Sequence, residues 1–99
     1  MLHTVNKSPT ERNSLESCLK HLDNGSAVLL IEDGIYGALI GGSVGKLVER
    51  ALANYPIYAL KPDIEARGMQ DRIIKGIQLI GYDGFVDLVV EHPNVQSWL

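Results

Sequence analysis

Cys18 is the one cysteine in the 99-residue chain, and its side chain offers the most obvious chemistry. A cysteine that exchanges sulfur must be accessible and must ionise, because the thiolate is the attacking form. Cys18 shares a helical face with Leu15 and Leu22, and free cysteine is among the most buried residue types. His21, one turn further on, would lower the thiol pKa only slightly. The spacing favours a structural thiol in the core, with a catalytic carrier role as the alternative.

The segment Gly41–Lys46 matches two motifs in part. A phosphate-binding P-loop needs a glycine five residues before the Gly-Lys pair and a Ser or Thr after the lysine, but Ile40 and Leu47 hold these positions. The segment also contains Gly-x-Ser-x-Gly, centred on Ser43. That turn presents the nucleophile in Ser-His-Asp hydrolases only where it follows a strand directly. A flexible turn is the favoured interpretation, and a small anion-binding domain is an alternative hypothesis.

Asp33 and three histidines complete the candidate residues. Asp33 follows a predicted strand, and the carboxyl edge of a parallel sheet is where ligands commonly bind. We expect Asp33 to cap the next helix, at the best place for a small cleft. His3, His21 and His92 are scattered and the cysteine has no second cysteine beside it, so no zinc ligand set is recognisable. We therefore expect neither a metal nor a cofactor.

Alternating strands and helices must position these residues. Strands are predicted at 2–4, 27–31, 57–60, 77–80 and 95–99, the last at a sheet edge. Helices are predicted at 9–23, 44–55, 62–68 and 83–92, with a glycine-rich loop and a short helix between 35 and 45. The apolar runs are continuous, which is typical of a parallel sheet buried on both faces. We predict one domain over residues 1–99, a three-layer α/β/α fold with about five mostly parallel strands.

Two helix starts are predicted from capping residues. Ser8 is a capping residue, Pro9 suits the first helical position, and Glu11 completes a capping box, so the first helix is expected to begin here. Asp83 is expected to cap the last helix.

Apolar residues lie on two sides of that last helix. Phe85, Leu88 and Val89 share one face, whereas Val86 and Val90 lie on another. A surface helix of a small monomer usually has a single apolar stripe, so a second one indicates cover from outside the chain. The alternative is that these valines are tolerated surface residues. We predict that the five residues form a partner interface.

Charge and composition exclude other classes of function. The formal net charge is −3, and lysine and arginine form no basic stripe, so direct nucleic-acid binding is not expected. The longest apolar run, 27–31, is too short to span a bilayer, and the N-terminus lacks the features of a signal peptide. A single cysteine excludes an internal disulfide, and we expect a cytoplasmic protein.

Five groups of short segments, distributed along nearly the whole chain, form a recognisable pattern: Met1–Val5 with Lys7–Pro9, Leu29–Gly34, Tyr58–Leu60 with Asp63–Gly68, Tyr82–Leu88 and Ser97–Trp98. These segments resemble the TusB/DsrH family of sulfur-relay proteins. Each is weak alone, but together and in this order they are specific. Ile35–Asn54 fits the family pattern least.

The resemblance implies a DsrE-like fold and assembly with TusC-like and TusD-like subunits into a heterohexamer. Such a complex passes persulfide sulfur from a TusA-like donor toward a TusE-like acceptor, for 2-thiolation of the wobble uridine of tRNA. Its relay cysteine lies on the TusD-like subunit, so this chain is expected to be non-catalytic. In the DsrH branch, which serves sulfur oxidation, an early cysteine occurs, and Cys18 is the only residue that would correspond to it. Whether the isolated chain forms a homo-oligomer is left open by the sequence.

Overall fold

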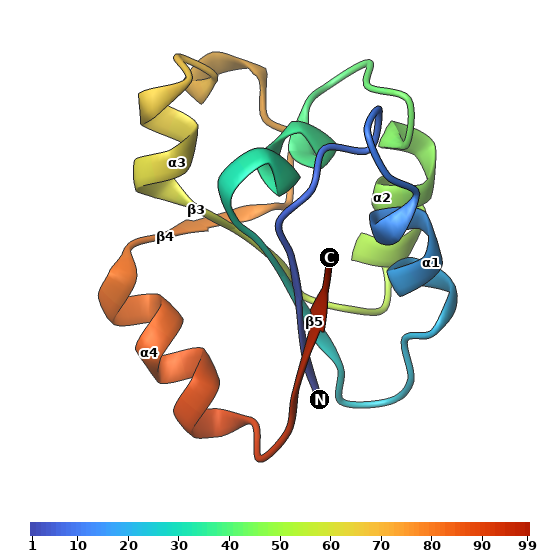
Figure 1. Cartoon of the computed structure of the whole chain (residues 1–99), viewed down its shortest axis with the longest axis vertical. Helices are drawn as coiled ribbons and strands as arrows, with labels where there is room; N and C mark the ends of the chain where they lie inside the picture. Colours follow the sequence, from blue (N-terminus) through green and yellow to red (C-terminus); the bar gives the residue numbers. More distant parts are fainter.

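The computed structural model describes all residues 1–99 as a five-stranded sheet with helices on both faces (Figure 1). The elements are β1 Leu2–Val5, α1 Ser14–Lys20, β2 Ala27–Leu30, the 3-10 helix η1 Glu32–Ala38, α2 Gly45–Leu52, β3 Ile57–Leu60, α3 Lys61–Ala66, the 3-10 helix η2 Gln70–Arg72, β4 Gln78–Ile80, α4 Tyr82–Glu91 and β5 Val95–Trp98. The strand order is β4-β3-β2-β1-β5, and all neighbouring strands are parallel. The predicted three-layer architecture is confirmed, with β5 at an edge.

The central strands are buried because their sequences are apolar on both sides. Every residue of β1 and β2 is buried, and only Tyr58 of β3 is partly exposed. Side chains alternate between the two faces of a strand, so a strand buried along its whole length must be covered on both faces. Helices from both layers provide this cover.

The helices are divided unequally between the two faces. On one face α1, α2 and η1 pack on the sheet, and Ile64 of α3 joins the same core of 14 buried residues. On the other face α4 stands alone, over a core of four buried residues, Leu2, Ala27, Leu29 and Leu88. In Figure 1, α1 and α2 lie together on the right, and α4 lies by itself at the lower left. None of the helices is long and apolar enough to cross a membrane.

The first helix begins at Ser14, so the predicted start at Ser8 is wrong. The backbone N–H groups of Glu11 and Arg12 both donate to the Ser8 carbonyl, which closes a turn. The Ser8 hydroxyl accepts from the Thr10 N–H at 3.3 Å, and no capping-box bond forms. The residues that favour a helix start here make a local turn instead, because a serine side chain serves both purposes.

The last helix is capped by Gly81 and not by Asp83, which lies in the first turn. There the carboxylate still favours the helix N-terminus through the macrodipole. Gly84 allows α4 to approach β4 closely, because a Cβ at this position would lie only 2.9 Å from the Cβ of Ile80. The absence of a side chain at Gly84 therefore lets the first turn of α4 pack against the end of β4.

Candidate functional site

Cys18 lies inside the larger core and is completely inaccessible, with 0% of its surface exposed. Burial raises the pKa of this thiol to about 12, because the thiolate would lose its hydration. His21 does not compensate for that loss. Its Nδ1 lies 2.7 Å from the Ser17 carbonyl oxygen, and its ring lies against Trp98 with the ring centroids 5.7 Å apart. At neutral pH the sulfur is therefore protonated, and none of its surface is exposed to solvent.

The segment Gly41–Lys46 forms a turn and the first residues of α2. It follows η1 rather than a strand, and no hydrogen bond joins Ser43 to a histidine or a carboxylate. Gly41 has a φ of +77°, which suits the turn. The structure therefore provides no nucleophile elbow, and the anion-binding hypothesis stays a prediction.

Asp33 binds Arg67 and does not cap η1, so the predicted capping role is wrong. Its Oδ1 accepts from Arg67 Nη2 at 2.9 Å and from Nε at 3.3 Å. This hydrogen bond raises the pKa of Arg67 further. Arg67 Nη1 also donates to the Asp63 carbonyl at 3.1 Å. The guanidinium thus ties η1, which follows the carboxyl end of β2, to α3, and no surface cavity is lined by Asp33.

A second bond strengthens this junction. The Asp63 carboxylate accepts from the Glu32 N–H at 2.6 Å. Glu32 has a φ of +50°, in the left-handed region that a non-glycine residue adopts only at a cost. The bond from Asp63 holds this turn, so the cluster of charges at the sheet edge has a structural purpose.

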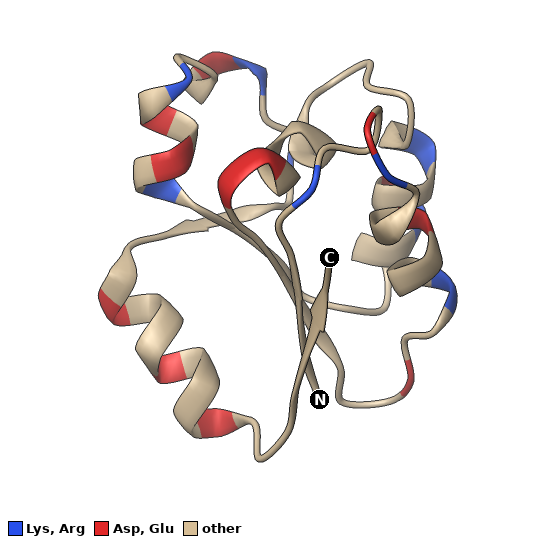
Figure 2. Cartoon of the chain, viewed as in Figure 1, with Lys and Arg blue, Asp and Glu red and all other residues tan.

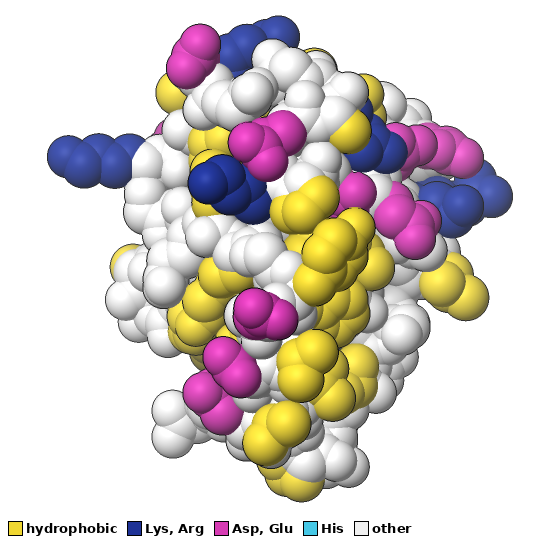
Figure 3. Space-filling model, turned by 90° about the vertical axis from the view of Figure 1, so that its left-hand side faces the viewer, with side chains coloured by type: hydrophobic (Ala, Val, Ile, Leu, Met, Phe, Trp, Pro, Cys, Tyr) yellow, Lys and Arg dark blue, Asp and Glu magenta, His cyan; other side chains and the backbone are white.

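The predicted interface on α4 divides into a buried part and an exposed part. Leu88 is 5% exposed and belongs to the chain's own core, and Phe85 packs against that core. Val86, Val89 and Val90 are 60%, 42% and 78% exposed. With Phe85 and Tyr82, which is 63% exposed, these valines line a groove of about 280 Å³ that has no polar surface. We call this set of five residues the α4 groove. Figure 3 shows apolar side chains gathered in the lower half of the view.

A hydrogen-bonded ring pair that the sequence did not reveal joins β1 to β5. Trp98 Nε1 donates to His3 Nδ1 at 3.0 Å, so His3 is the neutral tautomer with its proton on Nε2. Burial lowers the pKa of His3, since the imidazolium would be desolvated. The partners are 95 positions apart in the chain, and no local pattern links them. The pair fastens the edge strand to the rest of the sheet.

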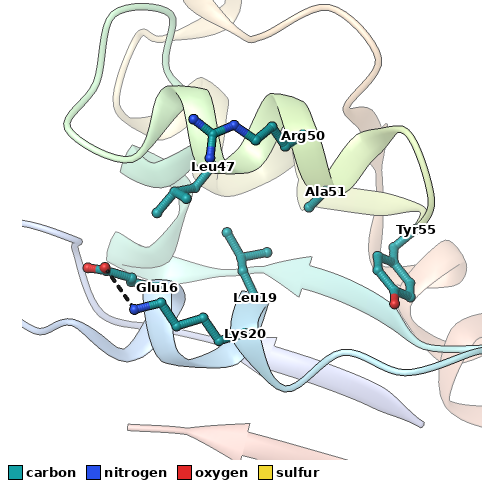
Figure 4. Close-up of a pocket in the computed structure, with 7 residues that line it drawn as sticks. All are labelled: Glu16, Leu19, Lys20, Leu47, Arg50, Ala51 and Tyr55. Carbon is teal, nitrogen blue, oxygen red and sulfur yellow. Dashed lines mark hydrogen bonds and ion pairs between the residues drawn. The ribbon is translucent and has the colours of Figure 1, made fainter.

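A shallow hollow of about 230 Å³ separates α1 from α2 (Figure 4). Leu19 and Leu47 point into it from the two helices, and Lys20 pairs with Glu16 at 3.3 Å along one wall. Its lining contains no serine, threonine or cysteine that a base could activate. No group of three or more His, Cys, Asp or Glu side chains is placed to hold a metal ion. The molecule therefore presents one buried thiol and one exposed apolar groove as its notable features.

Comparison with known proteins identifies the family. The model of the family described as "DsrH like protein" matches residues 7–95. The chain belongs to this family. Among its relatives, the protein TusB of Pectobacterium carotovorum subsp. carotovorum is 44% identical over 99 residues, which are 99% of this chain and 100% of the relative. The TusB protein of Escherichia coli K12 is 39% identical over 100 residues, with the same shares covered. The predicted membership is confirmed.

Solved structures show the same fold at low sequence identity. The ychN protein of E. coli has a TM-score of 0.80 and 18% identity, with 97% of each chain covered. The protein MTH1491 of Methanobacterium thermoautotrophicum has a TM-score of 0.77 and 13% identity, with 97% of this chain and 96% of the other covered. The DsrE-like fold expected from the resemblance is thereby confirmed.

Proposed function

We propose that the chain is a non-catalytic subunit of a cytoplasmic TusBCD-like sulfur-relay complex, which supports persulfide transfer for 2-thiolation of the tRNA wobble uridine. Membership of the TusB/DsrH family supports a sulfur-relay role. The state of Cys18 is the observation that carries the proposal. A relay cysteine must be an accessible thiolate, whereas this thiol is 0% exposed and has a pKa of about 12.

The α4 groove is the surface that would serve such a subunit. Its exposed apolar side chains gain free energy when a partner covers them, on the order of 1 kcal/mol for each half-exposed valine. TusC-like and TusD-like subunits would be the direct partners. The TusA-like donor and the TusE-like acceptor would then act on the thiol of the TusD-like subunit. This chain contributes by holding that subunit in the assembled complex.

Reconstitution with the TusC-like and TusD-like proteins of the same organism tests this role. Cys18→Ala is expected to keep assembly and sulfur transfer, because the sulfur only fills space. The double variant Val86→Asp, Val90→Asp is expected to lose assembly, because it places two charges in the apolar contact. Ile40→Asp, at another exposed apolar residue away from α4, is the matched control and should assemble normally.

Assembly is measured by co-purification, and transfer is measured as thiolated tRNA retarded in a mercury-containing gel. If Cys18→Ala folds and assembles but abolishes transfer, the non-catalytic role is wrong, and the DsrH-like carrier role of Cys18 replaces it.

A further inference from the structure

Acidic residues run beside the α4 groove. Asp83, Asp87 and Glu91 are spaced four apart along α4, and all three are exposed. On a helix this spacing aligns them in one stripe, next to the stripe of Val86 and Val90. Figure 2 shows that α4 carries no basic residue, and Figure 3 shows acidic side chains beside the apolar ones. We call these three residues the acidic stripe.

Asp87 and Glu91 of the acidic stripe are unfavourably placed in the isolated chain, whereas Asp83 lies in the favourable first turn. Like charges four residues apart destabilise a helix, and an acid in the last turn opposes the macrodipole. Glu91 is in the last turn, which has no basic residue, and none of the three carboxylates forms an ion pair within the chain. A local arrangement that lowers stability without compensation commonly marks a functional surface. A basic surface on a partner would supply the positive charge that the chain itself does not place beside them.

We propose that the α4 groove binds a polypeptide surface that has an apolar centre and, along one side, a rim of lysine or arginine that pairs with the acidic stripe. This inference rests on the proposed function in taking a sister subunit as the first partner to test. The carboxylates would repel the phosphates of nucleic acids and of anionic lipids, which disfavours RNA and membrane surfaces as occupants. Burial of the valines supplies affinity, and the charges set orientation and association rate.

The substitution Asp87→Lys separates an interface charge from a structural one. In the isolated chain it replaces two like-charge pairs by two opposite-charge pairs, with Asp83 and with Glu91, so the melting temperature should rise. In the complex the same change puts a cation against the basic rim. At low salt the affinity for the TusC-like and TusD-like subunits should fall roughly tenfold or more, and the loss should shrink at high salt as screening increases.

Glu49→Lys is the matched control, because it reverses an exposed acid on α2, on the other face of the sheet. Its affinity for the subunits should stay within about twofold of the unsubstituted chain, as expected for a charge outside the contact. A loss as large as that of Asp87→Lys, or an Asp87→Lys variant that binds as tightly as the original at low salt, would overturn the inference.

Photo-crosslinking distinguishes this inference from the proposed function. Replacing Tyr82 by p-benzoylphenylalanine puts a crosslinker at the edge of the groove in the living cell. Crosslinks to a protein segment that contains apolar residues beside lysine or arginine, abolished by Asp87→Lys, support the inference. If that protein is not a Tus-like subunit, the proposed function fails while the inference stands. Crosslinks to lipid, to RNA or to the α1–α2 side of a second copy, and the absence of any crosslink, overturn it.

Discussion

On one face of the sheet, α1, α2 and η1 bury a core of 14 residues, whereas on the other face α4 covers a core of only four. The first face includes the thiol of Cys18 and has a shallow hollow between α1 and α2. The second face presents a groove with no polar surface, flanked by unpaired acids. We call them the closed face and the open face.

The difference shows how a chain of 99 residues divides its apolar side chains between folding and association. A domain of this size has a small stability margin, so most of its apolar residues must serve its own core. The closed face provides that core. The open face leaves valines exposed to water, where they do not stabilise the folded monomer. They contribute favourable free energy only when another surface covers them.

Thiol reactivity gives the largest expected contrast between the faces. A pKa of about 12 instead of 9.0 lowers the thiolate fraction of Cys18 at neutral pH roughly a thousandfold. Iodoacetamide should therefore alkylate the native chain at least that much more slowly than the urea-unfolded chain. The matched reference is Val90→Cys in a Cys18→Ala background, which puts a thiol on the open face and should react like a model thiol. Similar alkylation rates for Cys18 and for the thiol at position 90 in the folded chain would contradict the predicted difference between the two faces.

Side-chain truncation should show the same contrast in stability. Leu30→Ala on the closed face removes a fully buried side chain and should lower the free energy of unfolding by about 2–5 kcal/mol. Val90→Ala on the open face removes a side chain that is already in water, so its effect should stay within about 0.5 kcal/mol. Urea denaturation of the isolated chain measures both. A large loss for Val90→Ala would mean that the open face is part of the monomer's core.

The smallest expected effect is on the pH dependence of stability. It comes from His3, on the closed face beside the edge strand β5. Burial lowers the pKa of His3 from its ordinary value of 6.5, so the unfolded chain binds the proton more tightly than the folded chain does. The corresponding stability is present above pH 6.5 and is lost as the pH falls through the folded pKa. Protonation would also remove the acceptor for Trp98 Nε1. Met1, Asp23 and His21 are the other charged or titratable groups that act on this imidazole.

His3→Gln tests this linkage, because the amide oxygen can accept from Trp98 but does not titrate. Denaturation from pH 7.5 down to pH 5 should show a steeper loss of stability for the original chain than for the variant. His92→Gln, at the far end of α4, is the control and should keep the original slope. A His3→Gln variant with an unchanged slope would exclude His3 as the source.

The strands and the helical face of Cys18 could be predicted because their signals are local. The runs at 27–31 and 57–60 place β2 and β3 within a residue of their observed bounds. The spacing of Leu15 and Cys18 predicts the buried side of α1 correctly. The sequence also showed that α4 has apolar residues on two sides. It did not show which of these residues the chain itself would bury. Leu88 proved to be core, and Val86 and Val90 proved to be exposed.

The wrong predictions concern polar side chains that can form a hydrogen bond with more than one partner. Ser8 closes a turn rather than capping a helix, and Asp33 binds an arginine rather than a helix N-terminus. Each alternative satisfies the same oxygen atom, so the residue type alone does not distinguish between them. The choice depends on what the rest of the chain brings within reach.

By itself, the sequence determined the class of fold, the inward direction of the single thiol and the excess of apolar residues on the last helix. These properties depend on periodicity within a few residues, which every strand and helix must obey. Only the tertiary structure decided the strand order, the Asp33–Arg67 and Trp98–His3 bonds, and the pairing of open valines with unpaired acids. These depend on groups 34 or 95 positions apart, or on what is left uncovered after packing, and chain folding alone brings them together.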